Sequence, residues 1–132
     1  MATLDEIEMA IKVIESENNN NIVLLHCIAL YPPKNKEINL RNITMMQNVF
    51  KYPVGFSDHS RSPTIGPITA VSLGGKIIEK HLTLNNSMKG PDHKASLNFK
   101  NFFRMVKNIR KIETLLGSET KKPSKNEKKH IK

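Results

Sequence analysis

The chain has 132 residues, of which 38% are apolar and 25% are charged, a composition typical of one modest folded domain with its own core. No apolar run is long enough to cross a membrane. The amino terminus lacks a basic start and an apolar signal core, and the single cysteine excludes an internal disulfide. We therefore expect a cytoplasmic protein with no membrane partner.

The net charge of +9 comes from 21 Lys and Arg residues against 12 Asp and Glu residues. About half of this excess follows Gly117, where six lysines stand against two glutamates. The chain also has no tryptophan and two tyrosines, so it offers no aromatic platform for stacked bases. The composition favours a solvated Lys-rich linker or tail at residues 118–132 and disfavours a nucleic acid partner. The alternative, a basic nucleic acid binder, predicts an affinity that falls steeply with salt.

The first predicted elements are a helix and a strand. Thr3 and Glu6 have the spacing of a capping box, and apolar residues at helical spacing follow to about residue 16. The asparagine run at 18–21 ends this helix. Residues 22–28 form an apolar run rich in branched side chains, which is typical of a strand buried on both faces.

The rest of the chain repeats this alternation. We predict a helix at about 39–50, a strand at 54–58, a helix from 65 to the glycines at 74–75, a strand at 76–82, and a helix at 99–116 that Gly117 stops. If the preceding loop is merely solvated, Ser96 caps this last helix. Helices alternating with strands in this way build βα units with a parallel sheet. A closed barrel of such units needs eight strands and about 250 residues. We therefore expect an incomplete barrel, part of a larger α/β fold.

Polar side chains follow the first two predicted strands, at the edge where parallel α/β proteins place their chemistry. His26 ends the first strand and His59 follows the second. Two imidazoles with open coordination positions suit Mn, Fe or Zn, and a hydrogen-bonded structural histidine is the alternative for each. Asp58 either orients an imidazole or caps a turn. Cys27 alternates with His26, and we expect it to face the helices as a small apolar residue.

The third predicted strand leaves two possibilities open. Glu79 and His81 are two residues apart and share one face of a strand, whereas Lys80 points to the other face. Either Glu79 with His81 or Lys80 alone therefore lines the site. In the following loop, His93 and Lys94 are placed to meet an anionic substrate, with a solvated loop as the alternative.

Six segments resemble motifs of the sialic acid synthase (N-acetylneuraminate synthase) family, in the order and spacing of that family. They are LLHC (24–27), YP (31–32), VGFSDH (54–59), AVSLGG (70–75), IEKHLT (78–83) and GPDHKAS (90–96). The resemblance implies a (β/α)₈ TIM barrel followed by a small antifreeze-protein-like domain, usually in a domain-swapped dimer. It assigns residues 1–117 to strands six to eight of that barrel, with their helices. A homodimer or a complementing chain would complete the site.

The resemblance also implies a reaction. Family members condense phosphoenolpyruvate with an N-acetylated amino sugar such as N-acetylmannosamine, giving a nine-carbon 2-keto sugar acid and phosphate. By resemblance, His26 and His59 match the two histidines that hold a divalent metal, commonly manganese, which polarises the sugar aldehyde and positions the reactants. The other predicted site residues are Glu79 and Asp58 as catalytic groups, and Ser57, His81, His93 and Lys94 as substrate-binding groups. The alternative is a non-catalytic fragment or interaction module that pairs with another chain.

Overall fold

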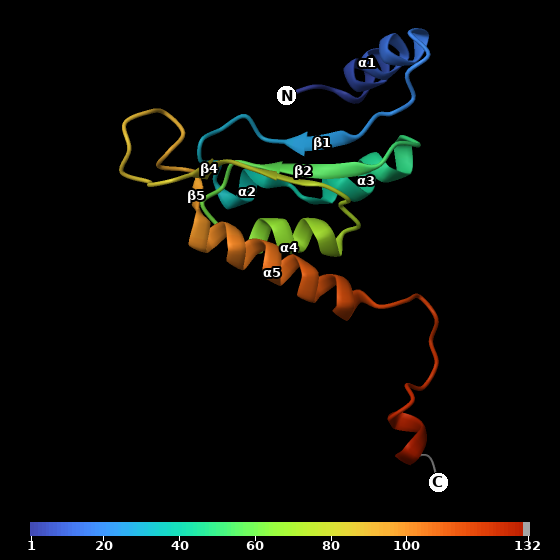
Figure 1. Ribbon diagram of the computed structural model, residues 1–132. Helices are drawn as coiled ribbons and strands as arrows, with labels where there is room; N and C mark the ends of the chain where they lie inside the picture. Colours follow the sequence, from blue (N-terminus) through green and yellow to red (C-terminus); the bar gives the residue numbers. More distant parts are fainter. Residues whose placement is uncertain (131–132) are drawn as a thin grey trace.

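The structure, a computed structural model, describes residues 1–130 of the chain. Its elements are α1 (Leu4–Ser16), β1 (Leu24–Cys27), α2 (Asn35–Ile38), α3 (Arg41–Val49), β2 (Val54–Asp58), α4 (Ile65–Ser72), β3 (Ile78–Lys80), β4 (Leu82–Thr83), β5 (Leu97–Asn98), α5 (Phe99–Leu116) and the 3₁₀ helix η1 (Glu127–His130) (Figure 1). Among these residues, no helix has both the length and the apolar character that a membrane crossing requires. The predicted alternation of helices and strands is confirmed.

The three longer strands form one parallel sheet in the order β1-β2-β3. This arrangement confirms the α/β class with parallel strands. The carboxyl ends of the strands meet at one edge of the sheet, because Cys27 pairs with Ser57 and the last register pair of β2 and β3 is Asp58 with Lys80. That edge is where the predicted site residues gather.

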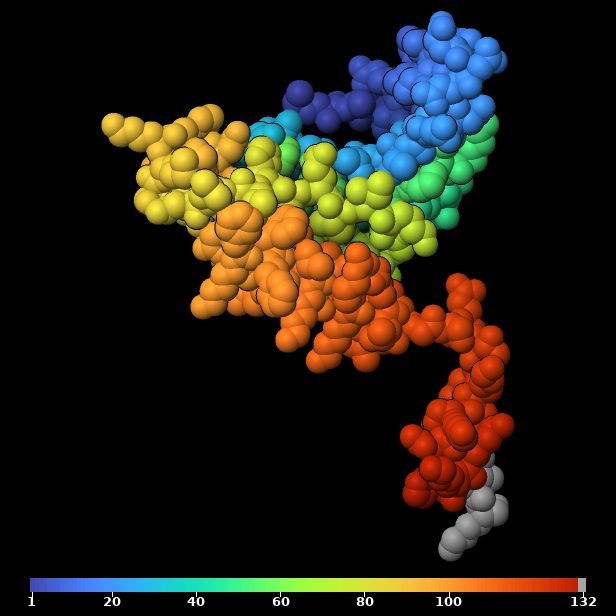
Figure 2. All heavy atoms as spheres, in the orientation of Figure 1, coloured from blue at the N-terminus to red at the C-terminus, as the bar shows by residue number. Residues whose placement is uncertain are grey.

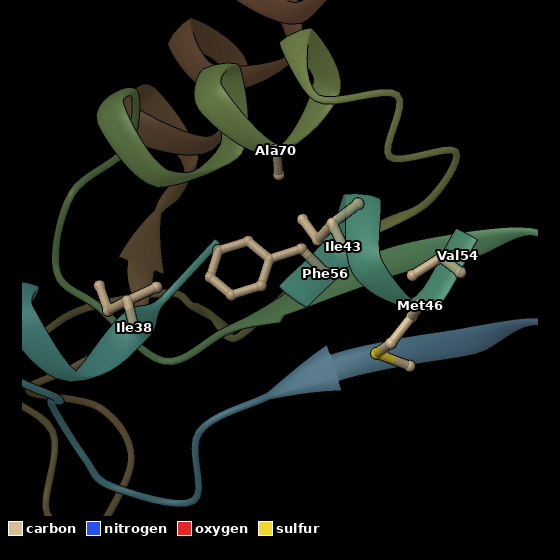
Figure 3. Close-up of a cluster of buried hydrophobic side chains, with 6 residues drawn as sticks. All are labelled: Ile38, Ile43, Met46, Val54, Phe56 and Ala70. Atoms are coloured by element: carbon tan, nitrogen blue, oxygen red, sulfur yellow. The ribbon is translucent and has the colours of Figure 1, made fainter. Parts of the chain in front are cut away.

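A helix layer covers one face of the sheet. Its buried core consists of Ile38, Ile43, Met46, Val54, Phe56 and Ala70 (Figure 3). The ring of Phe56 points from β2 into this layer, between α2 and α4. Because side chains alternate along a strand, Asp58 shares this face with Phe56, whereas Ser57 lies on the opposite face. The sheet therefore has one face covered by helices and one face that carries polar groups.

The first and last helices pack at opposite sides of this core. The capping box predicted at Thr3 and Glu6 is present and begins α1, which packs Ile11 against Ile22 and Tyr52. On the other side, α5 packs against the outer surface of α4 (Figure 1). Both helices begin and end within a residue or two of their predicted bounds.

The helix predicted at about 39–50 is confirmed as α3, which is continuous from Arg41 to Val49. A short helix, α2, precedes it, and Asn39 separates the two with a left-handed backbone at φ 46°. Asn is one of the few residues that adopts this conformation at low cost. The helix proper, α3, therefore begins at Arg41.

The prediction of one continuous strand at 76–82 is wrong. It divides after Lys80, and β4 leaves the main sheet to pair in parallel with β5. The predicted cap of the last helix is also wrong. The Asn98 side chain accepts a hydrogen bond from the Asn101 backbone N–H at 3.0 Å, whereas Ser96 Oγ donates to the Asp92 carbonyl.

Residues 117–130, which follow α5, stand clear of the body of the molecule (Figure 2). Gly117 ends α5 with a φ of 58°, and residues 117–130 are all exposed. This placement agrees with a linker or tail, of which residues 131–132 lie outside the described residues.

Candidate active site

The open face of the sheet carries a row of polar side chains contributed by the three strands. Cys27, Ser57 and Glu79 are register partners across β1, β2 and β3, so all three lie on the same face. Ser57 Oγ donates a hydrogen bond to Glu79 Oε1 at 2.6 Å. The predicted substrate-binding serine and the predicted catalytic glutamate are therefore joined to each other.

Three rings gather just beyond the strand ends, and we call them the two-histidine cluster: His59, His81 and Tyr31. The ring centroids of His59 and His81 are 5.3 Å apart, with the planes inclined by 65°. Tyr31 stacks on His59 at 4.0 Å between centroids and meets His81 edge-on at 5.6 Å. Sequence reasoning did not include Tyr31 in the site, although it lies only four residues beyond the end of β1, at the same edge.

The hydrogen bonds of His59 leave one ring nitrogen able to bind a ligand. His59 Nδ1 lies 2.9 Å from the Ile28 carbonyl, which can only accept, so Nδ1 carries the proton. Nε2 then presents a lone pair, which accepts a hydrogen bond from the Tyr31 hydroxyl at 3.2 Å, so a ligand bound to Nε2 would replace this bond. Cys27 Sγ lies 3.9 Å from His59 Nδ1, so this cysteine faces the site and not the helices, contrary to expectation.

The structure does not bring His26 together with His59 as the sequence predicted. The pairing of His26 with Phe56 in the β1–β2 register turns its ring to the helix layer, where it stacks on Phe56. There the side chain is buried, and Nε2 donates to the Ile38 carbonyl at 2.7 Å. The histidine that lies beside His59 is His81, from the end of β3.

Asp58 and Lys80 form an ion pair on the covered face, with 2.8 Å between Lys80 Nζ and Asp58 Oδ2. The other carboxylate oxygen accepts from the Ser60 N–H at 2.7 Å, so of the two expected roles Asp58 caps a turn and does not orient an imidazole. Burial lowers the pKa of Lys80, and the hydrogen bond and charge of Asp58 oppose this shift. The open choice between Glu79 and Lys80 is thus decided, because Lys80 faces the helices.

The loop that carries His93 and Lys94 is tied to β4. His93 Nδ1 and Thr83 Oγ1 are 2.8 Å apart, and Asn86 Nδ2 donates to the His93 carbonyl at 2.8 Å. Lys94 is exposed. Over residues 1–130, no hydrogen bond or ring contact joins His93 or Lys94 to the two-histidine cluster.

Within residues 1–130, His59 and His81 are the two side chains placed to bind one metal ion, and no larger set of ligands is found there. No group of three or more His, Cys, Asp and Glu side chains suited to an ion occurs among residues 1–130. His59 and His81 would leave most coordination positions to substrate and water. Such an open site is typical of a catalytic metal and not of a structural one.

The comparisons with known proteins agree along almost the whole chain. A model of the NeuB family matches residues 1–121. The N,N'-diacetyllegionaminic acid synthase of Campylobacter jejuni is 44% identical over 133 aligned positions, which cover 99% of this chain and 40% of that protein. The human N-acetylneuraminate-9-phosphate synthase is 35% identical over 122 positions, covering 92% of this chain and 33% of that protein.

Solved structures show the same relationship. The N-acetylneuraminic acid (sialic acid) synthetase of Leptospira borgpetersenii, in complex with citrate, superposes with a TM-score of 0.88 at 31% identity, covering 98% of this chain and 45% of that one. The spore coat polysaccharide biosynthesis protein SpsE of Bacillus subtilis gives a TM-score of 0.85 at 40% identity, covering 94% and 35%. The chain spans less than half the length of each of these relatives. It belongs to the NeuB family, the family of the sialic acid synthases.

Proposed function

We propose that this chain supplies the metal-binding part of a NeuB-family synthase, with His59 and His81 as the protein ligands. The complete enzyme would condense phosphoenolpyruvate with an N-acetylated amino sugar, giving a nine-carbon 2-keto sugar acid and phosphate. The observation that carries this proposal is the pair of imidazoles at adjacent strand ends, 5.3 Å apart between ring centroids. The synthases to which the chain is similar support this class of product.

We also propose that the sheet is strands six to eight of a TIM barrel. Three parallel strands with helices on one face support this placement, because a barrel puts its helices outside. The face with Ser57 and Glu79 would then line the barrel interior. Catalytic residues at the carboxyl ends of strands are the rule in such barrels, and the two-histidine cluster lies at those ends. The free thiol of Cys27 supports a reducing cytoplasm as the compartment.

The donor set of the two-histidine cluster fits a divalent ion. Neutral imidazoles bind Mn, Fe and Zn, and we propose manganese. A bound ion of this kind supplies Lewis acidity that polarises the sugar carbonyl. The Ile28 carbonyl holds the His59 ring in the tautomer whose Nε2 can bind a ligand. Tyr31 stacks on the same ring and covers one of its faces.

Glu79 is the proposed catalytic carboxylate. Ser57 fixes one of its oxygens at 2.6 Å, and the residue is exposed on the open face of the sheet. The second oxygen is then placed to accept a proton from a substrate hydroxyl or from water. Lys94, exposed in the loop after β4, and the neighbouring His93 are proposed to meet the anionic groups of phosphoenolpyruvate.

Calorimetric titration of the purified chain with Mn²⁺, with phosphoenolpyruvate present, tests the metal site. We expect saturable binding that is lost in both His59→Ala and His81→Ala. His130→Ala is the matched control, since this histidine is exposed in the segment after α5 and has no place in the proposed site, and the variant should bind Mn²⁺ as the unchanged chain does. Absence of binding in the unchanged chain, or binding that survives both cluster substitutions, would refute the proposal.

A second candidate function follows from the edges of the sheet. β1 and β3 each pair only with β2 in the main sheet, so both outer edges have unpaired backbone groups. A non-catalytic module could use these edges to pair with another chain. Co-expression with the strand-one-to-five segment of a NeuB relative separates the two functions. A complex that consumes phosphoenolpyruvate supports the enzyme, whereas a stable complex without turnover supports the module.

A further inference from the structure

We propose that the buried ion pair of Asp58 and Lys80 is a positioning device that sets the separation of His59 and His81. It would thereby set the affinity of the site for its metal. This inference rests on the proposed function and assigns to the pair a role that neither residue performs by contact with metal or substrate.

The ion pair is buried and makes several hydrogen bonds. The side chains of Lys80 and Asp58 are 1% and 0% exposed, with 2.8 Å between Nζ and Oδ2. Asp58 Oδ1 accepts from the Ser60 N–H at 2.7 Å, and Lys80 Nζ also donates to the Ser60 carbonyl. The chain on both sides of His59 is therefore tied to the end of β3 by these side-chain bonds.

Backbone pairing ends before the two histidines. The register of β2 and β3 runs from Phe56 with Ile78 to Asp58 with Lys80 and stops there. His59 and His81 each come one residue later, where no ladder bond joins the two chain segments. The ion pair joins β2 to β3 one residue before each ligand, and Lys80 also bonds to the Ser60 carbonyl, one residue after His59. A change in this link would be transmitted directly to the distance between the imidazoles.

The pair acts from the opposite side of the sheet. Its carboxylate lies under the first turn of α4, where a Cβ built on Gly66 would be 3.1 Å from Asp58 Oδ2. The two-histidine cluster lies beyond the strand ends, near Cys27 of the open face. The ion pair and the site are thus separated by the backbone that carries both. Any effect on metal binding must therefore pass through the positions of His59 and His81.

Stability alone does not account for this arrangement. Removing two charges from water is costly, and replacing a whole buried ion pair by neutral groups of similar volume is often neutral or stabilising. Removing both charges together can therefore leave the fold intact and still loosen the link between the strands. A variant that lacks both charges but still folds can therefore distinguish a positioning role, which predicts weaker metal binding, from a merely structural role, which does not.

The decisive variant is Asp58→Asn with Lys80→Met in the full chain. Asn keeps the acceptor toward the Ser60 N–H, and Met keeps the length of the lysine stem. We expect the double variant to unfold cooperatively and to bind Mn²⁺ about 10 to 100-fold more weakly, the range typical of lost outer-sphere support of a metal ligand. In the metal-free chain, the cross-peak between the imidazole protons of His59 and His81 in nuclear Overhauser spectra should weaken.

Two controls accompany this variant. Glu15→Gln with Lys51→Met removes an ion pair of 3.0 Å that lies far from the strand ends, and Mn²⁺ affinity should not change. Lys80→Arg keeps the charge pair, and its affinity should lie closer to that of the unchanged chain than to that of the double variant.

The outcomes separate this inference from the proposed function. If the unchanged chain binds no Mn²⁺, the proposed function fails. If it binds Mn²⁺ and the folded double variant binds equally well, the positioning role is overturned while the metal site stands. Should the double variant not fold, Asp58→Asn alone, which removes the ion pair but keeps the acceptor toward the Ser60 N–H, is judged by the same criterion.

Discussion

The two residues at the end of β1, His26 and Cys27, point to opposite faces of the sheet. His26 turns into the helix layer and bonds to the Ile38 carbonyl, while Cys27 turns to the open face and approaches His59. The apolar run at 22–28 could not reveal which of its side chains point to which face of the sheet, because a strand buried on both faces has no alternation of apolar and polar residues. The register of β1 with β2 decides it, and register is a tertiary property. The sequence therefore located histidines at the strand ends, but it placed His26 beside His59, where the structure has His81.

Substitution of His26 by Phe tests this reassignment at the level of one residue. Phe keeps the ring against Phe56 but leaves the buried Ile38 carbonyl without its donor, at a cost of about 1–3 kcal/mol in the free energy of unfolding. Mn²⁺ affinity should stay that of the unchanged chain. Urea unfolding and calorimetry measure the two quantities. Loss of Mn²⁺ binding in a folded His26→Phe chain would return His26 to the metal site.

Elements with strong local signals were predictable, and those made by tertiary contacts were not. The capping box at Thr3 begins α1, and α5 ends before Gly117, as their sequences indicate. β4 and β5 have two residues each, too few for any periodicity, and exist because they pair with each other. The split of the third strand after Lys80 follows from that pairing. It is also what moves His81 out of the main sheet and beside His59.

The first turn of α4 gives a test at the level of an element. Ala is a better helix former than Gly, yet a Cβ at Gly66 would lie 3.1 Å from Asp58 Oδ2 and 3.3 Å from the Phe56 ring. Asp58 cannot retreat, because Lys80 and Ser60 hold it. We expect Gly66→Ala to lower the free energy of unfolding by about 1 kcal/mol, since overpacking outweighs the gain in helix propensity.

The matched control in the same helix is Thr69→Ala, at an exposed position. This change should raise the free energy of unfolding by up to about 0.5 kcal/mol. Urea denaturation compares the two variants. A stabilised Gly66→Ala chain would contradict the tight contact between α4 and the ion pair.

At the scale of the whole molecule, the order of elements was enough to predict a parallel sheet. Right-handed crossovers between successive parallel strands leave few alternatives. The same order predicted that the sheet is too small to close on itself. What the order could not provide is which face of the sheet the helices cover, and hence which of Glu79 and Lys80 is exposed on the open face. The charge distribution was also informative, because residues 118–130 of the Lys-rich segment stand outside the body (Figure 1).

Deletion of residues 118–132 should therefore leave the folded body unchanged. The described part of this segment is fully exposed and adds no side chain to either buried cluster. We expect the midpoint of thermal unfolding to shift by no more than about 2 °C. Circular dichroism measures this shift. Retention on a heparin column should fall, since six lysines and two glutamates are removed. A large loss of thermal stability would show that the segment packs on the body.

The two tyrosines give the molecule an optical readout of its own. With no tryptophan in the chain, fluorescence excited in the tyrosine absorption band comes from Tyr31 and Tyr52. Tyr31 stacks on His59 in the site, whereas Tyr52 bonds to Glu15 and joins α1 to the body. In a Tyr52→Phe background, fluorescence would follow the site without any added dye. In a Tyr31→Phe background, it would follow the docking of α1.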